Sequence, residues 1–150
     1  MRTIAVIGPG SSATPDDMAN AFEVGRGVAA AGHVLISGGL GGVMEAASRG
    51  AASRRGLVVG LLPGSDRSAA NPYVSLAVPT GLGEMRNALL VRSADAVICV
   101  GGSWGTLSEV ALAMRTGVPL VMLGGWDLPP GPALATSASE AVDLALALID

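Results

Sequence analysis

The 150-residue sequence contains no lysine, and all nine of its basic residues are arginine. A lysine Schiff base is therefore excluded, and with it the chemistry of ordinary pyridoxal-phosphate enzymes such as lysine decarboxylases. The lysine of the phosphate-binding loop of nucleoside triphosphatases is missing for the same reason. Cys99 is the only cysteine and His33 the only histidine, so one chain cannot build a disulfide framework or a zinc cluster. We expect no metal site.

Charge and aromatic side chains are also scarce. Only 14% of the residues are charged, against about 25% in a typical soluble domain. Aromatic residues make up 3% of the chain and hydrophobic residues 50%, so valine, leucine, isoleucine and alanine must fill the core. The low charge predicts that another subunit covers some helix faces, and we expect a homo-oligomer, a dimer or a tetramer.

Two further absences concern partners and location. The net charge is −3 and no block of basic residues occurs, so the electrostatic signature of a nucleic-acid-binding protein is missing. No apolar run approaches the length of a transmembrane helix, and the N-terminal residues resemble a strand rather than a signal peptide. We expect a cytoplasmic protein that contacts neither nucleic acid nor membrane.

What the sequence does contain is an alternation of strand and helix signals. The strands are near-continuous apolar runs, which is typical of a parallel sheet buried on both faces by helices. We therefore predict a single Rossmann-like α/β domain over residues 1–150, with a doubly wound parallel sheet. Strands are expected at 3–8, 33–37, 56–62, 95–101 and 119–123, with a short one within 73–78. Helices are expected at 15–31, 42–54, 83–92, 106–115 and 137–149.

Glycine-rich turns directly follow three of these strands. Their sequences are GPGSS (8–12), GGLGG (38–42) and GGSWG (101–105). In a parallel sheet these turns share the carboxyl edge, where ligands of such folds bind. Glycine lets backbone N–H groups approach an anion, and the helix that follows adds its positive end. Together the turns predict an anionic or phosphorylated ligand. The first turn departs from the dinucleotide fingerprint, because Ala13 takes its last glycine position.

Two charged residues near these turns are candidates for the chemistry. Arg86 lies in the first turn of a predicted helix, where a cation opposes the helix dipole by about 0.3–1 kcal/mol. That position is reasonable if Arg86 meets a phosphate, and the alternative is pairing with Glu84 or solvent. Glu109 either acts on a ligand or completes a capping box that Thr106 begins.

Two other features leave alternatives open. Trp104 is unusual in a glycine loop, and it either covers a ligand ring or packs at a subunit contact. The polar segment 63–72 is either a mobile lid or an ordered surface loop.

Several motifs then occur in a characteristic order: SGGLGGVMEAASRGA, GLLPG, PTGLGEMRN, SADAVICVGGSWGTLSEVALAM and GVPLVML. This combination, from Thr3 to Leu123, resembles the LOG-like (SLOG) superfamily. Its enzymes are cytokinin riboside 5′-monophosphate phosphoribohydrolases, and many members were once labelled lysine decarboxylases. The sequence is most similar to a short subgroup that includes molybdenum-cofactor carrier proteins. Val100 and Asn87 replace a proline and a lysine of the hydrolases, which disfavours hydrolase activity.

The resemblance implies a binding protein for a phosphorylated, ring-containing small molecule, either molybdenum cofactor or a purine nucleotide. The alternative is a nucleoside 5′-monophosphate phosphoribohydrolase, in which Arg86 holds the phosphate and Glu109 acts at the ribose to release base and ribose 5-phosphate. A third hypothesis is a nucleotide-sensing subunit of a partner protein. The expected ligand-binding residues are Gly8, Gly10, Ser11, Gly38, Gly39, Gly41, Gly42, Met44, Glu45, Arg86, Asn87, Gly101, Gly102, Ser103, Gly105 and Thr106.

Overall fold

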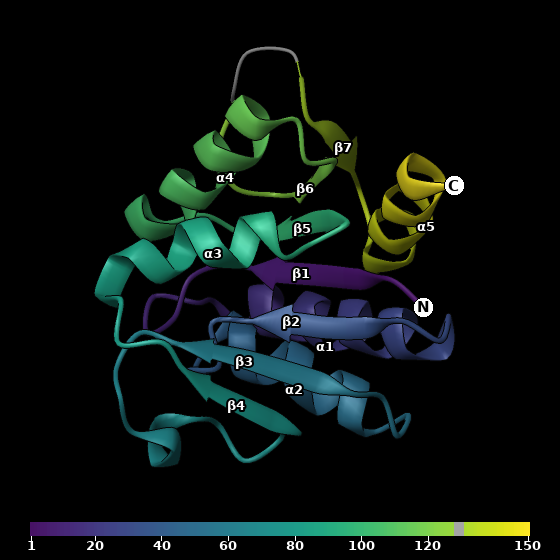
Figure 1. The fold of residues 1–150 in the computed structure, drawn as a ribbon. Coiled ribbons are helices and arrows are strands. Elements are labelled where there is room, and N and C mark those ends of the chain that lie inside the picture. Colours follow the sequence, from purple (N-terminus) through teal and green to yellow (C-terminus); the bar gives the residue numbers. More distant parts are fainter. Residues whose placement is uncertain (128–130) are drawn as a thin grey trace.

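A seven-stranded, fully parallel sheet runs through the protein in the order β4-β3-β2-β1-β5-β6-β7. The computed structural model describes residues 1–127 and 131–150. The strands are β1 (Thr3–Ile7), β2 (Val34–Ser37), β3 (Val58–Leu62), β4 (Leu76–Pro79), β5 (Ala96–Val100), β6 (Leu120–Leu123) and β7 (Ala133–Ala135). This sheet, with helices on both faces, confirms the predicted Rossmann-like architecture (Figure 1).

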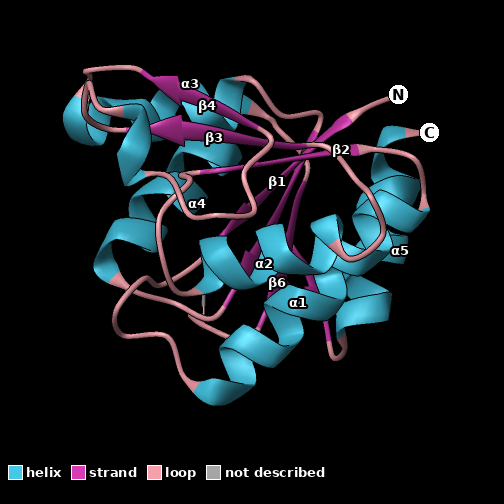
Figure 2. Cartoon of the chain, turned by 90° about the horizontal axis from the view of Figure 1, so that it is seen from below, coloured by secondary structure: helices cyan, strands magenta, loops and turns pink. Residues whose placement is uncertain are grey.

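Helices cover the two faces of the sheet unequally. The helices are α1 (Pro15–Ala30), α2 (Val43–Ala52), α3 (Arg86–Arg92), α4 (Trp104–Thr116) and α5 (Ala138–Ile149), with short 3₁₀ helices η1 (Arg67–Ala69) and η2 (Gly83–Met85). Side chains of α1, α2 and α5 form one hydrophobic core with the sheet, and those of α3 and α4 form a second core on the opposite face. Figure 2 shows α1 and α2 on the side of the sheet away from α3. The inner strand β5, next to the central strand β1, is buried along its whole length, as its continuous apolar sequence predicts.

The helix starts agree with the sequence signals at two places. Thr14 caps α1 in a complete capping box with Asp17, and Pro15 occupies the first helical position. Ser137 caps α5 by accepting a hydrogen bond from the Glu140 N–H at 3.2 Å. The Glu140 carboxylate accepts from the Thr136 N–H, one residue before the N-cap, so the Ser137–Glu140 spacing of a capping box does not give a complete box.

Several element boundaries differ from the predictions. The helix expected at 83–92 begins as the 3₁₀ helix η2 and becomes an α-helix at Arg86. Gly83 is not part of an α-helix, because its φ of 59° lies outside the α-helical region. The strand β7 was not predicted, since three residues are too few to show a pattern. The glycine- and proline-rich sequence GGWDLPPGP (124–132), which is typical of a turn-rich connection, lies partly outside the described residues.

The segment 63–72, predicted as a lid or an ordered loop, is anchored at its end by Asn71. The buried Asn71 side chain donates to the Leu40 carbonyl at 3.0 Å, and the Asn71 N–H donates to the Gly39 carbonyl at 2.8 Å. Arg67 also donates to the carbonyl of Ala77 in β4. The two bonds of Asn71 tie the segment to the second glycine turn, and the bond of Arg67 ties it to β4. No helix among the described residues combines the length and apolar character needed to cross a membrane.

Candidate functional site

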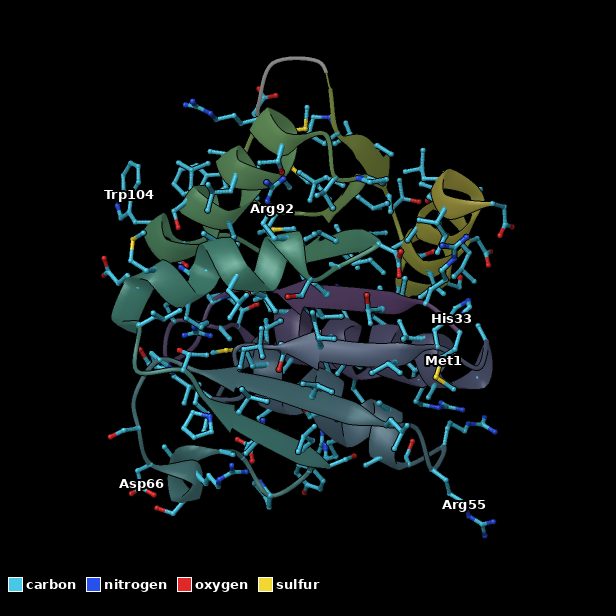
Figure 3. All side chains as sticks on the ribbon, in the orientation of Figure 1. Met1, His33, Arg55, Asp66, Arg92 and Trp104 are labelled. Carbon is cyan, nitrogen blue, oxygen red and sulfur yellow. The ribbon has the colours of Figure 1, made fainter. Side chains whose placement is uncertain are left out.

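The three glycine turns meet at one edge of the sheet. They follow β1, β2 and β5, which lie side by side with β1 in the middle. The strands that follow β1 in the sequence are added on one side of it as far as β4, and β5 is added on the other side. Ligands of open α/β sheets bind at the point where the strand order changes direction in this way. Figure 3 shows Trp104 at this carboxyl edge and His33, which directly precedes β2, at the opposite one. His33 accepts a hydrogen bond there from the Arg2 N–H at 3.2 Å.

A cavity of about 180 Å³ opens at this edge between the turns, α3 and α4. It is lined by residues from all three turns and both helices: Val6, Ile7, Gly8, Gly10, Gly38, Met44, Arg86, Asn87, Leu90, Ser103, Gly105, Thr106 and Glu109. Sequence reasoning did not propose Val6, Ile7 and Leu90. Together with Met44 they form the apolar part of the lining. Ile7 and Leu90 belong to the core between α3, α4 and the sheet, and Val6 belongs to the core on the other face.

The other proposed ligand-binding residues lie outside the lining of this cavity. They are Ser11, Gly39, Gly41, Gly42, Glu45, Gly101 and Gly102. Gly42 has a φ of +64°, and a Cβ there would collide with the backbone oxygens of Pro9 and Gly10, so it allows the first two turns to pack together. A Cβ on Gly101 would meet the Asp17 carboxylate, and one on Gly102 would meet the Trp126 indole. Gly42, Gly101 and Gly102 therefore allow close packing of the turns against their neighbours.

Arg86 is the cation of the cavity. It is the first residue of α3, and its guanidinium lies across Gly38, where a Cβ would overlap the Arg86 Nη1 atom. The side chain is half-buried, and its Nε has no hydrogen-bond partner among the described residues. Burial lowers the pKa of Arg86, an effect that the negative charge of Glu109 opposes. A buried donor without a partner costs free energy, so an anion in the cavity would relieve this cost.

The N-terminus of α4 adds a second positive group to the cavity. Ser103 is the N-cap: its hydroxyl accepts from the Thr106 N–H at 3.3 Å and lies 2.8 Å from the Thr106 hydroxyl. The N–H groups of Trp104 and Gly105 have no partner within the helix, as at every helix start. Ser103, Gly105 and Thr106 all line the cavity, so the positive end of the helix dipole faces the space that Arg86 also faces.

Glu109 is not a capping residue, and the predicted capping box with Thr106 is wrong. The helix begins at Trp104 rather than at Thr106, because Ser103 supplies the cap, and this places Glu109 in the second turn. The side chain lines the cavity with only 8% of the residue exposed. Its carboxylate forms no ion pair with Arg86 among the described residues. Burial raises the pKa of Glu109 to about 7, and the positive charge of Arg86 partly offsets the rise.

Other reactive groups are unsuited to chemistry here. Burial, with smaller contributions from the charges of Glu109 and Asp17, raises the pKa of the Cys99 thiol to about 12, so the thiol stays protonated. Among residues 1–127 and 131–150, no three histidine, cysteine, aspartate or glutamate side chains gather where a metal ion could bind. The cavity can thus hold an anion between Arg86 and α4, with Glu109 as its one acid.

Comparison with known proteins agrees with this arrangement. The sequence profile of the SLOG cluster4 family matches residues 1–145. The chain belongs to the SLOG cluster4 family. This SLOG cluster4 protein is 40% identical over 143 residues to an uncharacterized protein of Archaeoglobus fulgidus, covering 95% of this chain and 93% of that protein.

Solved structures extend the comparison. The molybdenum cofactor binding protein of the phototrophic bacterium Rippkaea orientalis is 39% identical and superposes with a TM-score of 0.95, covering 99% of this chain and 98% of that one. The molybdenum cofactor carrier protein of Chlamydomonas reinhardtii is 31% identical with a TM-score of 0.91, and 99% of each chain is covered. The predicted resemblance to the short SLOG subgroup that contains such carriers is confirmed.

Proposed function

We propose that this SLOG cluster4 protein binds a phosphorylated, ring-containing small molecule and acts as a carrier of molybdenum cofactor. The observation that carries the proposal is that Arg86, whose buried Nε has no hydrogen-bond partner among residues 1–127 and 131–150, and the N-terminus of α4 line the same small cavity. Both groups favour an anion, and an arginine fork suits a phosphate. The likeness to solved carrier proteins supports molybdenum cofactor as the ligand, with a purine nucleotide as the second candidate.

Binding in this account is capture without covalent chemistry. The phosphate lies against the Arg86 guanidinium and the first N–H groups of α4, and the turns of Gly8, Gly10 and Gly38 form the wall around it. The protonated form of Glu109 is compatible with this anion, because a neutral carboxyl group does not repel it. We place the carrier in the cytoplasm as a homo-oligomer.

One observation favours a second candidate, a nucleoside 5′-monophosphate phosphoribohydrolase. Glu109 lines the same cavity as Arg86 and has a pKa of about 7, so both of its protonation states are populated near neutral pH. A carboxyl group with this pKa can stabilise an oxocarbenium-like charge or move a proton at a glycosidic bond. In that reaction Arg86 would hold the phosphate.

The carrier proposal is tested by retention of the cofactor. Molybdenum cofactor released from a molybdoenzyme is mixed with the protein, the mixture is passed over a size-exclusion column, and molybdenum in the protein fraction is measured. We expect close to one equivalent per chain for the wild type and a large loss for Arg86→Ala. A wild-type protein that elutes free of molybdenum at every concentration would exclude this ligand.

The hydrolase candidate is tested separately by incubation with AMP and N6-substituted AMP, followed by chromatography of the free base. The carrier proposal predicts no release above the buffer blank. If the wild type releases free base and Glu109→Gln does not, the carrier proposal is wrong and the protein is a phosphoribohydrolase.

A further inference from the structure

A second hollow adjoins the anion cavity on the outer side of α3 and α4. It has a volume of about 460 Å³, and we call it the Trp104 groove. Its lining includes Met85, Asn87, Ala88, Trp104, Gly105 and Leu112. Asn87 and Gly105 line the anion cavity as well, so the two spaces adjoin at these residues.

Large apolar side chains are unusually exposed along this groove. Trp104 is 79% exposed and Met85 is 70% exposed, in a protein with only two tryptophans. The Trp104 ring lies 5.1 Å from the Trp126 ring at an interplanar angle of 43°. Most of the Trp104 indole stays exposed beside this contact. Figure 3 shows the Trp104 side chain at the carboxyl edge. An aromatic platform held in this way loses little conformational entropy when a ring stacks on it.

The volumes indicate how a ligand divides between the two spaces. Pockets for drug-sized ligands typically occupy about 300–1,000 Å³, and the anion cavity, at about 180 Å³, is smaller than this range. A cavity of this size suits the phosphate group of a ligand better than a phosphate and a ring system together. The ring of such a ligand would then lie outside the cavity, and the Trp104 groove is an adjoining space with a mostly apolar lining that includes an indole ring.

Polar groups stand where the two spaces meet. The Asn87 side-chain amide donates to the Ser108 hydroxyl at 3.5 Å, and the Ser108 hydroxyl donates to the Gly105 carbonyl at 2.6 Å. Asn87 thus lies between the phosphate position and the apolar groove, where it can hydrogen-bond the polar linker or ring edge of a ligand.

We infer that the Trp104 groove is the ring subsite of the same ligand site, in which Trp104 stacks on a flat, pterin-like heteroaromatic ring whose phosphate lies against Arg86. The inference rests on the proposed function. It gives Trp104 a role in specificity: the anion cavity recognises a phosphate of any source, and the groove selects phosphates that carry a flat ring.

The test compares three probes by titration calorimetry: inorganic phosphate, ribose 5-phosphate and neopterin 3′-monophosphate. Only the last carries a flat heteroaromatic ring. Stacking on an aromatic side chain is worth about 1–3 kcal/mol per base, so neopterin monophosphate should bind at least about fivefold more tightly than ribose 5-phosphate. Trp104→Ala should remove this advantage and leave the affinity for inorganic phosphate unchanged. Trp104→Phe should retain part of it.

A matched control is Leu134→Ala, which removes a large apolar side chain that is 72% exposed on β7, outside the groove. It should bind all three probes as the wild type does. Equal affinities of the wild-type protein for neopterin monophosphate and inorganic phosphate would exclude the ring subsite but not the phosphate site in the anion cavity. If none of the three probes binds, both the ring subsite and the proposed function are wrong.

A second copy of the chain is the other occupant that an exposed apolar groove could have. Sedimentation velocity of Trp104→Ala distinguishes the two cases. An unchanged sedimentation coefficient is expected for a ligand subsite. A shift toward a smaller species, with unchanged affinity for neopterin monophosphate, would assign Trp104 to a subunit contact instead.

Discussion

At the scale of single residues, the site depends on two ionisable side chains that do not pair. Arg86 is half-buried with an unpartnered Nε, and Glu109 is buried with a raised pKa, yet the two form no ion pair among the described residues. A buried ion pair would satisfy Arg86 and close the cavity to an anion. The separation of these two groups leaves the cation available to a ligand.

The first prediction concerns Arg86→Ala. A hydrogen bond to a charged group contributes about 1.5–3 kcal/mol, so the variant should bind inorganic phosphate about 10- to 100-fold more weakly. Calorimetric titration measures the affinity. Arg115→Ala removes an exposed arginine from the last turn of α4 and is the matched control. Equal losses in the two variants would show that net charge, and not the site, governs binding.

The second prediction concerns the pH dependence of stability. The pKa of Glu109 is about 7 in the folded protein and about 4.5 in the unfolded chain, so the folded state holds a proton that the unfolded state releases between these values. The free energy of unfolding should therefore fall as the pH rises from 4.5 to 7, by on the order of 3 kcal/mol, and level off above. Glu109→Gln should lose this contribution and become more stable than the wild type at pH 8.

Urea unfolding of both proteins across this pH range measures the difference. Exposed Glu23→Gln is the control, and its curve should run parallel to that of the wild type. If Glu109→Gln and the wild type also gave parallel curves, the carboxyl group would not be titrating in a buried site.

At the scale of elements, the site is made by turns whose glycines have different tasks. Gly38 provides the space that the Arg86 guanidinium occupies, whereas a Cβ on Gly41 would meet no atom within 4 Å. Gly41 also lacks the positive φ that Gly39 and Gly42 adopt. Within this turn, the site therefore requires a glycine at position 38 but not at position 41.

The third prediction uses this pair. Gly38→Ala should displace the Arg86 side chain and weaken phosphate binding about tenfold or more, because the cation then loses its place in the cavity. Gly41→Ala should bind as the wild type does. Titration with phosphate measures both affinities, and circular dichroism checks that both variants are folded. A Gly38→Ala variant with wild-type affinity would contradict the position assigned to Arg86.

The same elements show what the sequence could predict. The apolar strands and the glycines that follow them indicate the parallel sheet and its carboxyl edge, because both signals are local. The capping box of Glu109 was predicted wrongly because Ser103 and Thr106 are both good caps three residues apart, and only the structure shows which one begins α4. The contributions of Leu90 and Asn71 depend on contacts between distant segments, so no local pattern reveals them.

At the scale of the whole molecule, the fourth prediction is self-association. Only 14% of the residues are charged, and large apolar side chains are exposed at separate places that include Leu57, Leu76 and Leu148. Sedimentation equilibrium should give a mass that is two or four times the 14.8 kDa of one chain. A mass of one chain at every concentration tested would contradict the prediction.

The central claim is that a phosphorylated, ring-containing ligand binds at the carboxyl edge between Arg86 and the N-terminus of α4. A crystal structure of the protein with molybdenum cofactor tests it most directly, because anomalous scattering locates the molybdenum and electron density locates the phosphate. The account predicts the phosphate within hydrogen-bond distance of the Arg86 guanidinium and of the first N–H groups of α4. A cofactor bound elsewhere on the protein, with this cavity empty, would contradict it.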